Sequence, residues 1–115
     1  MNLAFHELPN GVRLIKLAGH LDTAGVSTVE PRFHRHCRGD EPRVVVDLSD
    51  TGFVGSLGIR MLLLAIKTVS ARGGRLLILN PVRAVDSVIE ISGLGQFVAR
   101  GSEAEAAAAV LQTRK

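Results

Sequence analysis

The sequence predicts a single α/β domain over residues 1–115, with a mixed, mostly parallel sheet of four or five strands and about four helices. The chain has 115 residues, of which 46% are hydrophobic, enough to bury the core of one domain. Two continuous apolar runs, Val44–Val46 within residues 43–48 and Leu76–Leu79, are typical of strands buried on both faces. The mostly apolar segment between them, Leu57–Ala71, is predicted to be a helix. The three segments therefore form a β-α-β unit, whose strands are expected to be parallel with a right-handed crossover.

An antiparallel hairpin is predicted at the start of the chain. Residues 3–8 and 12–17 have strand patterns, and Pro9-Asn10-Gly11 between them is a turn signal. Residues 19–25 follow as an expected loop.

The first helix is predicted to begin near Ser27, because Ser27 and Glu30 have the spacing of a capping box. Pro31 would then lie in the first turn, where its missing N–H costs little. The helix is expected to run to about Arg38 and to end at Gly39.

The second half of the chain shows similar start and stop signals. Gly73-Gly74 is expected to end the apolar helix, and residues 82–91 have the apolar spacing of another helix. Residues 97–98 are predicted to form a short edge strand. Ser102 is predicted to cap a final helix that runs through Gln112.

The charge pattern does not favour nucleic-acid binding. The net charge is +3, with seven cations and seven anions in residues 1–60 and seven against four in residues 61–115. The excess is not concentrated in a run. The chain has no Trp, no Tyr and four Phe, so a surface for stacking bases is not expected.

The chain also lacks signals for export or membrane insertion. Met1–Glu7 does not have the basic and apolar regions of a secretory signal. The longest apolar-rich stretch, Leu57–Ile66, is interrupted by Arg60 and is too short to span a bilayer. The single cysteine cannot form an intrachain disulfide, which fits a reducing compartment. We therefore expect a soluble, cytoplasmic protein.

No catalytic constellation is found in the sequence. Ser56 lacks one of the two glycines of a nucleophile elbow, and no phosphate-loop or dinucleotide motif is present. His34, His36 and Cys37 are close in sequence, but residues two apart on a helix point away from each other. We therefore expect a protein that is not an enzyme, with no catalytic residue, metal site or cofactor.

Ser56 has two interpretations. It lies between a buried strand and an apolar helix, so its hydroxyl could be an N-cap worth about 1 kcal/mol. Alternatively, Ser56 could be a phosphorylation site. A phosphate there would meet the positive end of the helix dipole, and about two added negative charges would repel a bound partner without unfolding the domain.

Five short segments occur in an order and spacing that are specific when taken together. They are Gly19–Asp22, Val44–Ser49, Phe53–Ile59, Arg72–Leu76 and Ile91–Leu94. Across nearly the whole chain they resemble the STAS domain family, in particular the bacterial anti-sigma factor antagonists. The third segment, Phe-Val-Gly-Ser-Leu-Gly-Ile, is similar to that family's Phe-Ile-Asp-Ser-Ser-Gly-Leu signature.

The resemblance implies a function in partner switching. In that family the unphosphorylated antagonist binds an anti-sigma factor that is also a serine kinase, which frees a sigma factor for transcription. The kinase then phosphorylates the serine that matches Ser56, the complex dissociates, and a phosphatase resets the cycle. The implied partner-binding residues are Asp22, Gly55, Ser56, Leu57, Ile59 and Arg60.

Three of these residues depart from the family pattern. The usual Asp before the acceptor serine is Gly55, the usual second Ser is Leu57, and a later Gly is Arg60. Gly55 removes a carboxylate that could help to present the hydroxyl. Arg60 lies at i+4 from Ser56, where it could pair with a phosphate or narrow the surface that a partner approaches.

Two aspartates also have a local structural interpretation. Asp22 and Asp47 could each accept hydrogen bonds from nearby backbone N–H groups rather than contact a partner. An apolar stripe at Leu62, Leu63 and Ile66 could suggest self-association, although such stripes more often face the core.

The resemblance allows a second function. Some STAS proteins resemble the accessory subunits of bacterial lipid-transport ABC systems, in which the domain braces an ATPase and need not be phosphorylated. A sensor of a small ligand is a third possibility, but no pocket signature supports it.

Overall fold

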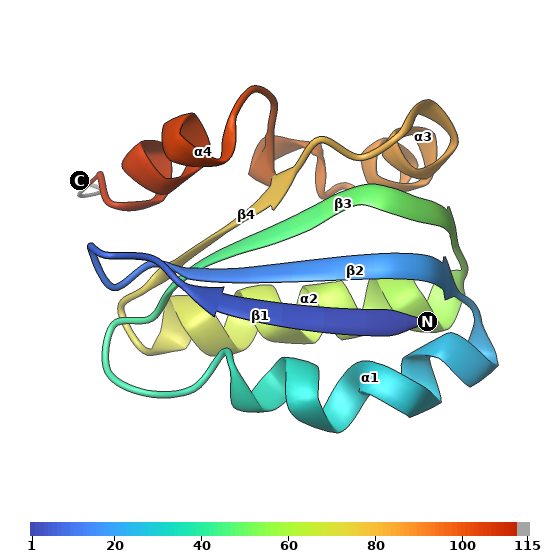
Figure 1. The fold of residues 1–115 in the computed structure, drawn as a ribbon. Helices are drawn as coiled ribbons and strands as arrows, with labels where there is room; N and C mark the ends of the chain where they lie inside the picture. The colour runs from blue at the N-terminus through green and yellow to red at the C-terminus, as the bar shows by residue number, and fades with distance from the viewer. Residues whose placement is uncertain (113–115) are drawn as a thin grey trace.

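The sheet has five strands in chain order, with β1 antiparallel to β2 and the later pairs parallel (Figure 1). The structure is a computed structural model, and it describes residues 1–112. The strands are β1 (Asn2–Glu7), β2 (Arg13–Leu21), β3 (Arg43–Val54), β4 (Arg75–Leu79) and β5 (Val98–Ala99). The helices are α1 (Thr23–Arg35), α2 (Ser56–Ala71), α3 (Arg83–Ile91) and α4 (Glu103–Val110). The predicted fold class, the hairpin and the parallel pairing around α2 are confirmed.

Two cores cover the two faces of the sheet. Figure 1 shows α1 and α2 on one side and α4 on the other. Val44 and Val46 face the larger core with side chains of α1, α2 and α3, whereas Val45 faces the smaller core under α4. This alternation explains why the Val44–Val46 run is apolar throughout. Leu62 and Ile66 are also buried in the larger core, so the apolar stripe of α2 faces inward.

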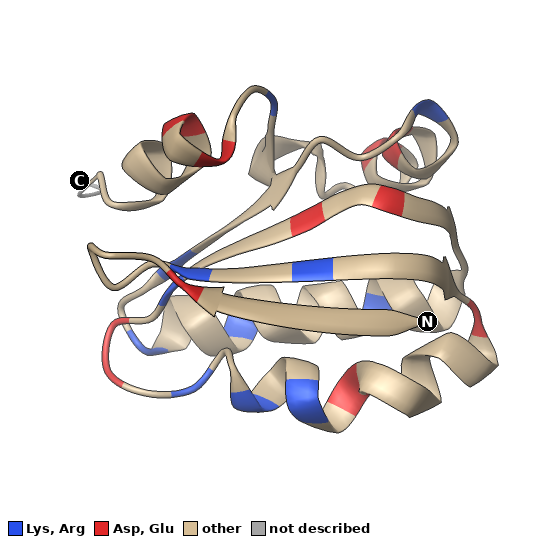
Figure 2. Ribbon diagram, in the orientation of Figure 1, with Lys and Arg blue, Asp and Glu red and all other residues tan. Residues whose placement is uncertain are grey.

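Arginines gather at the end of the sheet where the parallel strands begin (Figure 2). Arg13 donates to the carbonyl of His36 at 2.9 Å, just past the end of α1. Arg43 donates to the carbonyl of Gly73 at 3.1 Å, and Arg75 donates to the last turn of α4 at 2.9 Å. Helix C-termini present unpaired carbonyls and a partial negative charge. These arginines therefore stabilise helix ends, which accounts for part of the basic character of the chain.

The end of α1 is joined to the edge strand β1 through an aromatic stack. The imidazole of His36, the C-cap of α1, lies parallel to the ring of Phe5, with centroids 3.9 Å apart. Burial lowers the pKa of His36, and the nearby charges of Arg35, Arg13 and Arg32 lower it further. The folded protein therefore favours the neutral form of the His36 imidazole over the protonated form.

We expect His36 to make the protein less stable in mild acid. Its folded pKa is below the ordinary value of about 6.5, so the unfolded chain binds the proton first and stability falls as the pH drops below about 6.5. Urea unfolding at pH 7.5 and pH 5 should show a smaller loss for His36→Gln than for the wild type. His6→Gln, at an exposed position of β1, is the control. An unchanged loss in His36→Gln would contradict the prediction.

The first helix differs from its prediction. β2 continues through residues 19–21, and α1 begins at Thr23 with Asp22 as its N-cap, so neither the loop nor the start near Ser27 is correct. The helix ends at Arg35, a turn earlier than expected. Pro31 is its ninth residue and does not lie in the first turn as predicted. The carbonyl of Ser27 consequently loses its usual helical donor, and Ser27 is exposed, so water can take the donor's place.

The third strand is also longer than predicted, because it continues past Leu48 and ends at Val54. Pairing with β2 moves from Lys16–Asp47 to Ala18–Asp50, so β3 has one extra residue there, and a second irregularity follows. Such bulges bend a strand and redirect its side chains. The buried Thr51 hydroxyl donates to the Leu17 carbonyl at 2.8 Å, which satisfies a polar group inside the sheet.

The remaining boundaries differ from the predictions by one or two residues. α3 begins at Arg83, the edge strand is Val98–Ala99, and α4 ends at Val110 rather than Gln112. The predicted cap of α4 is confirmed, since Ser102 forms a full capping box with Glu105. None of the helices in residues 1–112 is long and apolar enough to cross a membrane.

Candidate functional site

The starts of α1 and α2 lie next to each other at the carboxyl ends of β2 and β3. Leu21 and Val54 are paired across the two strands, and the Gly55 N–H donates to the Leu21 carbonyl at 3.0 Å. Asp22 is the next residue after Leu21, and Ser56 is the next residue after Gly55. In open α/β sheets, binding sites form at this end of the strands. The fold thus brings together two segments that the sequence singled out separately.

Ser56 is the first residue of α2 and not its cap. The N-cap is Gly55, whose extended backbone (φ −93°, ψ −174°) precedes the helix, and no side chain caps α2. The Gly55 carbonyl accepts the Ile59 N–H at 3.0 Å, the first bond of the helix. The N-cap interpretation of Ser56 is therefore wrong. Ser56 is exposed, and its hydroxyl is not engaged in holding the helix start.

Two glycines allow both helices to begin close to the strand ends. A Cβ atom on Gly58 would lie 2.9 Å from Val54 Cγ1 and 3.0 Å from the Leu21 carbonyl oxygen. A Cβ atom on Gly25 would lie only 1.9 Å from the carbonyl oxygen of His20. Because heavy atoms cannot approach so closely, only glycine fits at position 25 without moving the backbone.

Three large apolar side chains are exposed on and around the first half of α2. The exposed fractions are 49% for Phe53, 42% for Leu57 and 41% for Leu64. We define the docking surface as these three residues together with Ser56 and Arg60. Exposed apolar groups beside a polar rim are typical of protein interaction sites. Leu57 and Arg60 were singled out from the sequence, whereas Phe53 and Leu64 were not predicted to be exposed.

The other predicted site residues have local roles. Asp22 Oδ1 accepts a hydrogen bond from the Gly25 N–H at 2.8 Å, which is the local backbone contact considered for this aspartate from the sequence. Asp47 Oδ1 accepts the Ser49 N–H at 2.9 Å in the same way. Ile59 is half-buried and packs against the larger core, so it supports the surface from below.

The histidines and the cysteine near the end of α1 are occupied by other contacts. His34 Nε2 lies 3.2 Å from Glu30 Oε2, and His36 stacks on Phe5. Cys37 is buried, and burial raises the pKa of its thiol to about 12, so it stays protonated at neutral pH. Within residues 1–112, no group of three or more His, Cys, Asp or Glu side chains could hold a metal ion.

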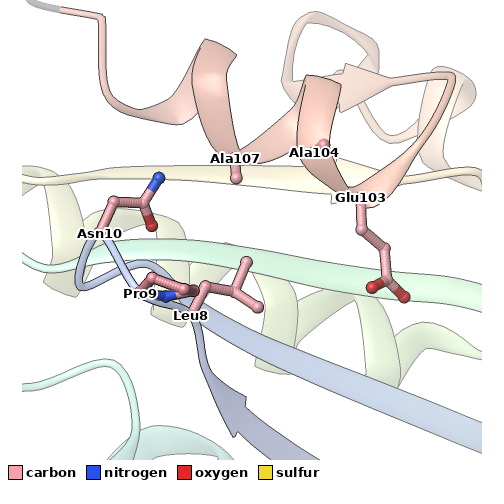
Figure 3. A pocket seen from close by; sticks show the side chains of 6 residues that line it. All are labelled: Leu8, Pro9, Asn10, Glu103, Ala104 and Ala107. Carbon is pink, nitrogen blue, oxygen red and sulfur yellow. The ribbon is translucent and has the colours of Figure 1, made fainter.

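A cavity of about 400 Å³ lies between the β1–β2 turn and α4, across the sheet from α1 and α2 (Figure 3). Figure 3 shows Leu8, Pro9 and Asn10 of the turn facing Ala104 and Ala107 of the helix. Among residues 1–112, Glu103 is the one charged residue that lines the cavity, and it is paired with Lys16 at 2.8 Å. The cavity shares no lining residue with the docking surface.

Comparison with protein families identifies the fold. A model of the STAS domain matches residues 6–108. The chain belongs to the STAS domain family. The resemblance of the sequence segments is thereby confirmed, and the five-stranded mixed sheet is the one expected for a STAS domain.

The relatives of this STAS domain include bacterial regulators. BtrV of Bordetella bronchiseptica, provisionally named an anti-sigma factor antagonist, is 30% identical over 104 residues, covering 90% of each chain. The anti-sigma F factor antagonist of Lysinibacillus sphaericus is 27% identical over 94 residues, covering 81% of this chain and 80% of the relative. The unphosphorylated form of the anti-sigma factor antagonist SpoIIAA superposes with a TM-score of 0.79 at 24% identity, covering 91% and 92% of the two chains.

The absence of a side-chain cap on α2 predicts that Gly55→Asp stabilises this STAS domain. Asp is a good N-cap, and its charge suits the helix dipole, so we expect a gain of about 0.5 kcal/mol. The new Cβ would lie 3.3 Å from the exposed Phe53 ring, which can move aside. Chemical unfolding should show the gain for Gly55→Asp but not for Gly55→Ala, which adds no acceptor. Equal stability of the two variants would contradict the capping argument.

Proposed function

We propose that this STAS domain is an anti-sigma factor antagonist that acts by binding rather than by catalysis. Its partner would be a cytoplasmic anti-sigma factor with serine kinase activity, bound through the docking surface. Phosphorylation of Ser56 would end the complex, and a phosphatase would restore the binding form. The family membership and the named relatives support this proposal.

The exposed Ser56 hydroxyl is the observation that carries the proposal. Ser56 lies at the first position of α2, does not cap the helix, and is flanked by exposed Phe53 and Leu57. A kinase can therefore reach the hydroxyl, while the same patch offers apolar area to a partner.

A phosphate on Ser56 would switch binding without unfolding the domain. Its two or so negative charges would be stabilised by the positive end of α2 and by first-turn N–H groups that no side chain caps. In a complex the same charges would have to be desolvated against the partner, which disfavours binding. Phosphorylation of Ser56 would thus leave the domain folded but weaken its complex with the partner.

The other implied contacts fit around this centre. Asp22 is exposed at the start of α1, next to the start of α2, and is available at the rim of a complex. Gly55 and Ile59 would act by positioning Ser56, since Gly55 is the N-cap of α2 and Ile59 packs the first turn against the larger core.

The test is phosphorylation by a native-cell extract. The protein is incubated with ATP and extract, its intact mass is measured, and any phosphate is mapped by peptide analysis. We expect one phosphate on Ser56 in the wild type and none in Ser56→Ala. An unmodified protein that instead co-purifies with an ATPase would contradict the proposal and support the accessory subunit of a lipid-transport ABC system.

A further inference from the structure

A groove lies between α1 and α2, and Leu57, the residue after Ser56, lines it. It has a volume of about 370 Å³, and its apolar lining comes from Val26 of α1 and from Leu57 and Leu64 of α2. Two charged side chains, Glu30 and Arg60, also line the groove. The groove therefore joins exposed apolar area of the docking surface to a pair of charges.

Among residues 1–112, the two charged side chains of the groove differ in their polar contacts. Glu30 Oε2 lies 3.2 Å from His34 Nε2 on the next turn of α1. Arg60 is exposed, and among residues 1–112 it has neither a salt bridge nor a side-chain hydrogen bond. Five of the nine other arginines in residues 1–112 do have such a partner, a backbone carbonyl or a carboxylate: Arg13, Arg43, Arg72, Arg75 and Arg100. Within the described part of the chain, the groove thus presents a guanidinium that pairs with no other side chain.

A guanidinium beside an apolar groove suits a particular kind of ligand. Its planar fork of donors pairs best with a carboxylate or phosphate, and the pairing is stronger where neighbouring apolar groups exclude water. Val26, Leu57 and Leu64 would receive an apolar side chain. A protein segment with an apolar residue next to an Asp or Glu satisfies both requirements.

We propose that the α1–α2 groove binds such an acidic segment of the anti-sigma factor, with the partner's carboxylate on Arg60. This inference rests on the proposed function and names the chemistry of its partner. It also gives phosphorylation a second effect. Ser56 and Arg60 are one turn apart on α2, so a phosphate on Ser56 competes with the partner's carboxylate for the same guanidinium.

The first test reverses single charges on α2. The anti-sigma factor that the wild type captures from native extract is purified and titrated against variants of the full chain. Arg60→Glu is expected to weaken binding by about tenfold or more, and Arg60→Lys by less. Lys67→Glu is the matched control, because Lys67 is exposed on α2 and does not line the groove. It should bind within about twofold of the wild type, and the Arg60 effect should shrink at high salt.

A second test does not depend on the partner. Phosphoserine is incorporated at position 56, and its second ionisation, ordinarily near pKa 6, is followed by phosphorus NMR. Pairing with Arg60 should lower this pKa relative to the Arg60→Gln variant. Equal pKa values in both proteins would overturn the competition between phosphate and partner.

The outcomes separate this inference from the proposed function. If Arg60→Glu binds as the wild type while Ser56→Asp does not, the groove is not the acidic-segment site but the antagonist function stands. If neither variant changes binding to the captured protein, both proposals fail. Unfolding midpoints of the variants guard against misfolding, which is not expected at an exposed position.

Discussion

Ser56→Asp is expected to weaken binding of the anti-sigma factor by about tenfold or more, whereas Ser56→Ala is expected to bind like the wild type. The aspartate adds a negative charge to the middle of the docking surface, where a bound partner would have to desolvate it. The charge of an aspartate is smaller than that of a phosphate. The loss of affinity measured for Ser56→Asp is therefore a lower limit for the loss caused by phosphorylation. Titration calorimetry with the purified partner measures the difference.

Ser56→Ala is a clean control because of where Ser56 lies. The hydroxyl does not cap α2, and Ala is well tolerated in a helix, so loss of the oxygen should not disturb the fold. If Ser56→Asp binds the same proteins with the same affinity as the wild type, Ser56 is not the switch. If Ser56→Ala also loses binding, the hydroxyl itself contacts the partner.

Gly25→Ala is expected to cost about 3 kcal/mol of unfolding free energy, near the upper end of what overpacking usually costs. In an unconstrained helix the same change would be stabilising by about 1 kcal/mol. Here the added Cβ would lie 1.9 Å from the His20 carbonyl oxygen, so the start of α1 has to move away from β2. Urea unfolding measures the loss. Partner binding should weaken as well, because α1 forms one wall of the groove.

Gly52→Ala provides the comparison for Gly25→Ala. Both positions lie at the same end of the sheet, but a Cβ on Gly52 would meet the His20 ring at an ordinary 3.5 Å. We expect its stability to stay within about 0.5 kcal/mol of the wild type. If both substitutions cost the same, the close approach of α1 to β2 is not what position 25 requires.

Local patterns predicted much of the fold. The Val44–Val46 run, the glycines after Ala71 and the Asn10-Gly11 turn each act over a few residues, and the corresponding strand, helix end and hairpin are present. The predictions were wrong where a distant strand or a competing cap decided the conformation. β3 extends past Leu48 because β2 lies alongside it.

The start of α1 shows the second kind of error. Ser27 has a convincing capping pattern, but Asp22 lies directly after β2 and caps the helix five residues earlier. Once Asp22 is the cap, Pro31 lies in the helix interior. Propensity alone disfavours that position, and contacts of Val29 and Phe33 with the core support the helix there.

Ser56, Leu57 and Arg60 could be chosen as site residues from the sequence, because motif order and helical spacing are properties of the chain. Whether Ser56 capped the helix, and which apolar residues stayed exposed, depended on packing. Gly58 lets the start of α2 lie close to Leu21, with Gly55 as the N-cap, and Leu64 lines the groove between α1 and α2. Local sequence patterns determine where strands, turns and helices form, because they depend on neighbouring residues. Which side chains stay exposed, and which charges find a partner, depends on segments that are distant in the sequence and meet only in the folded protein.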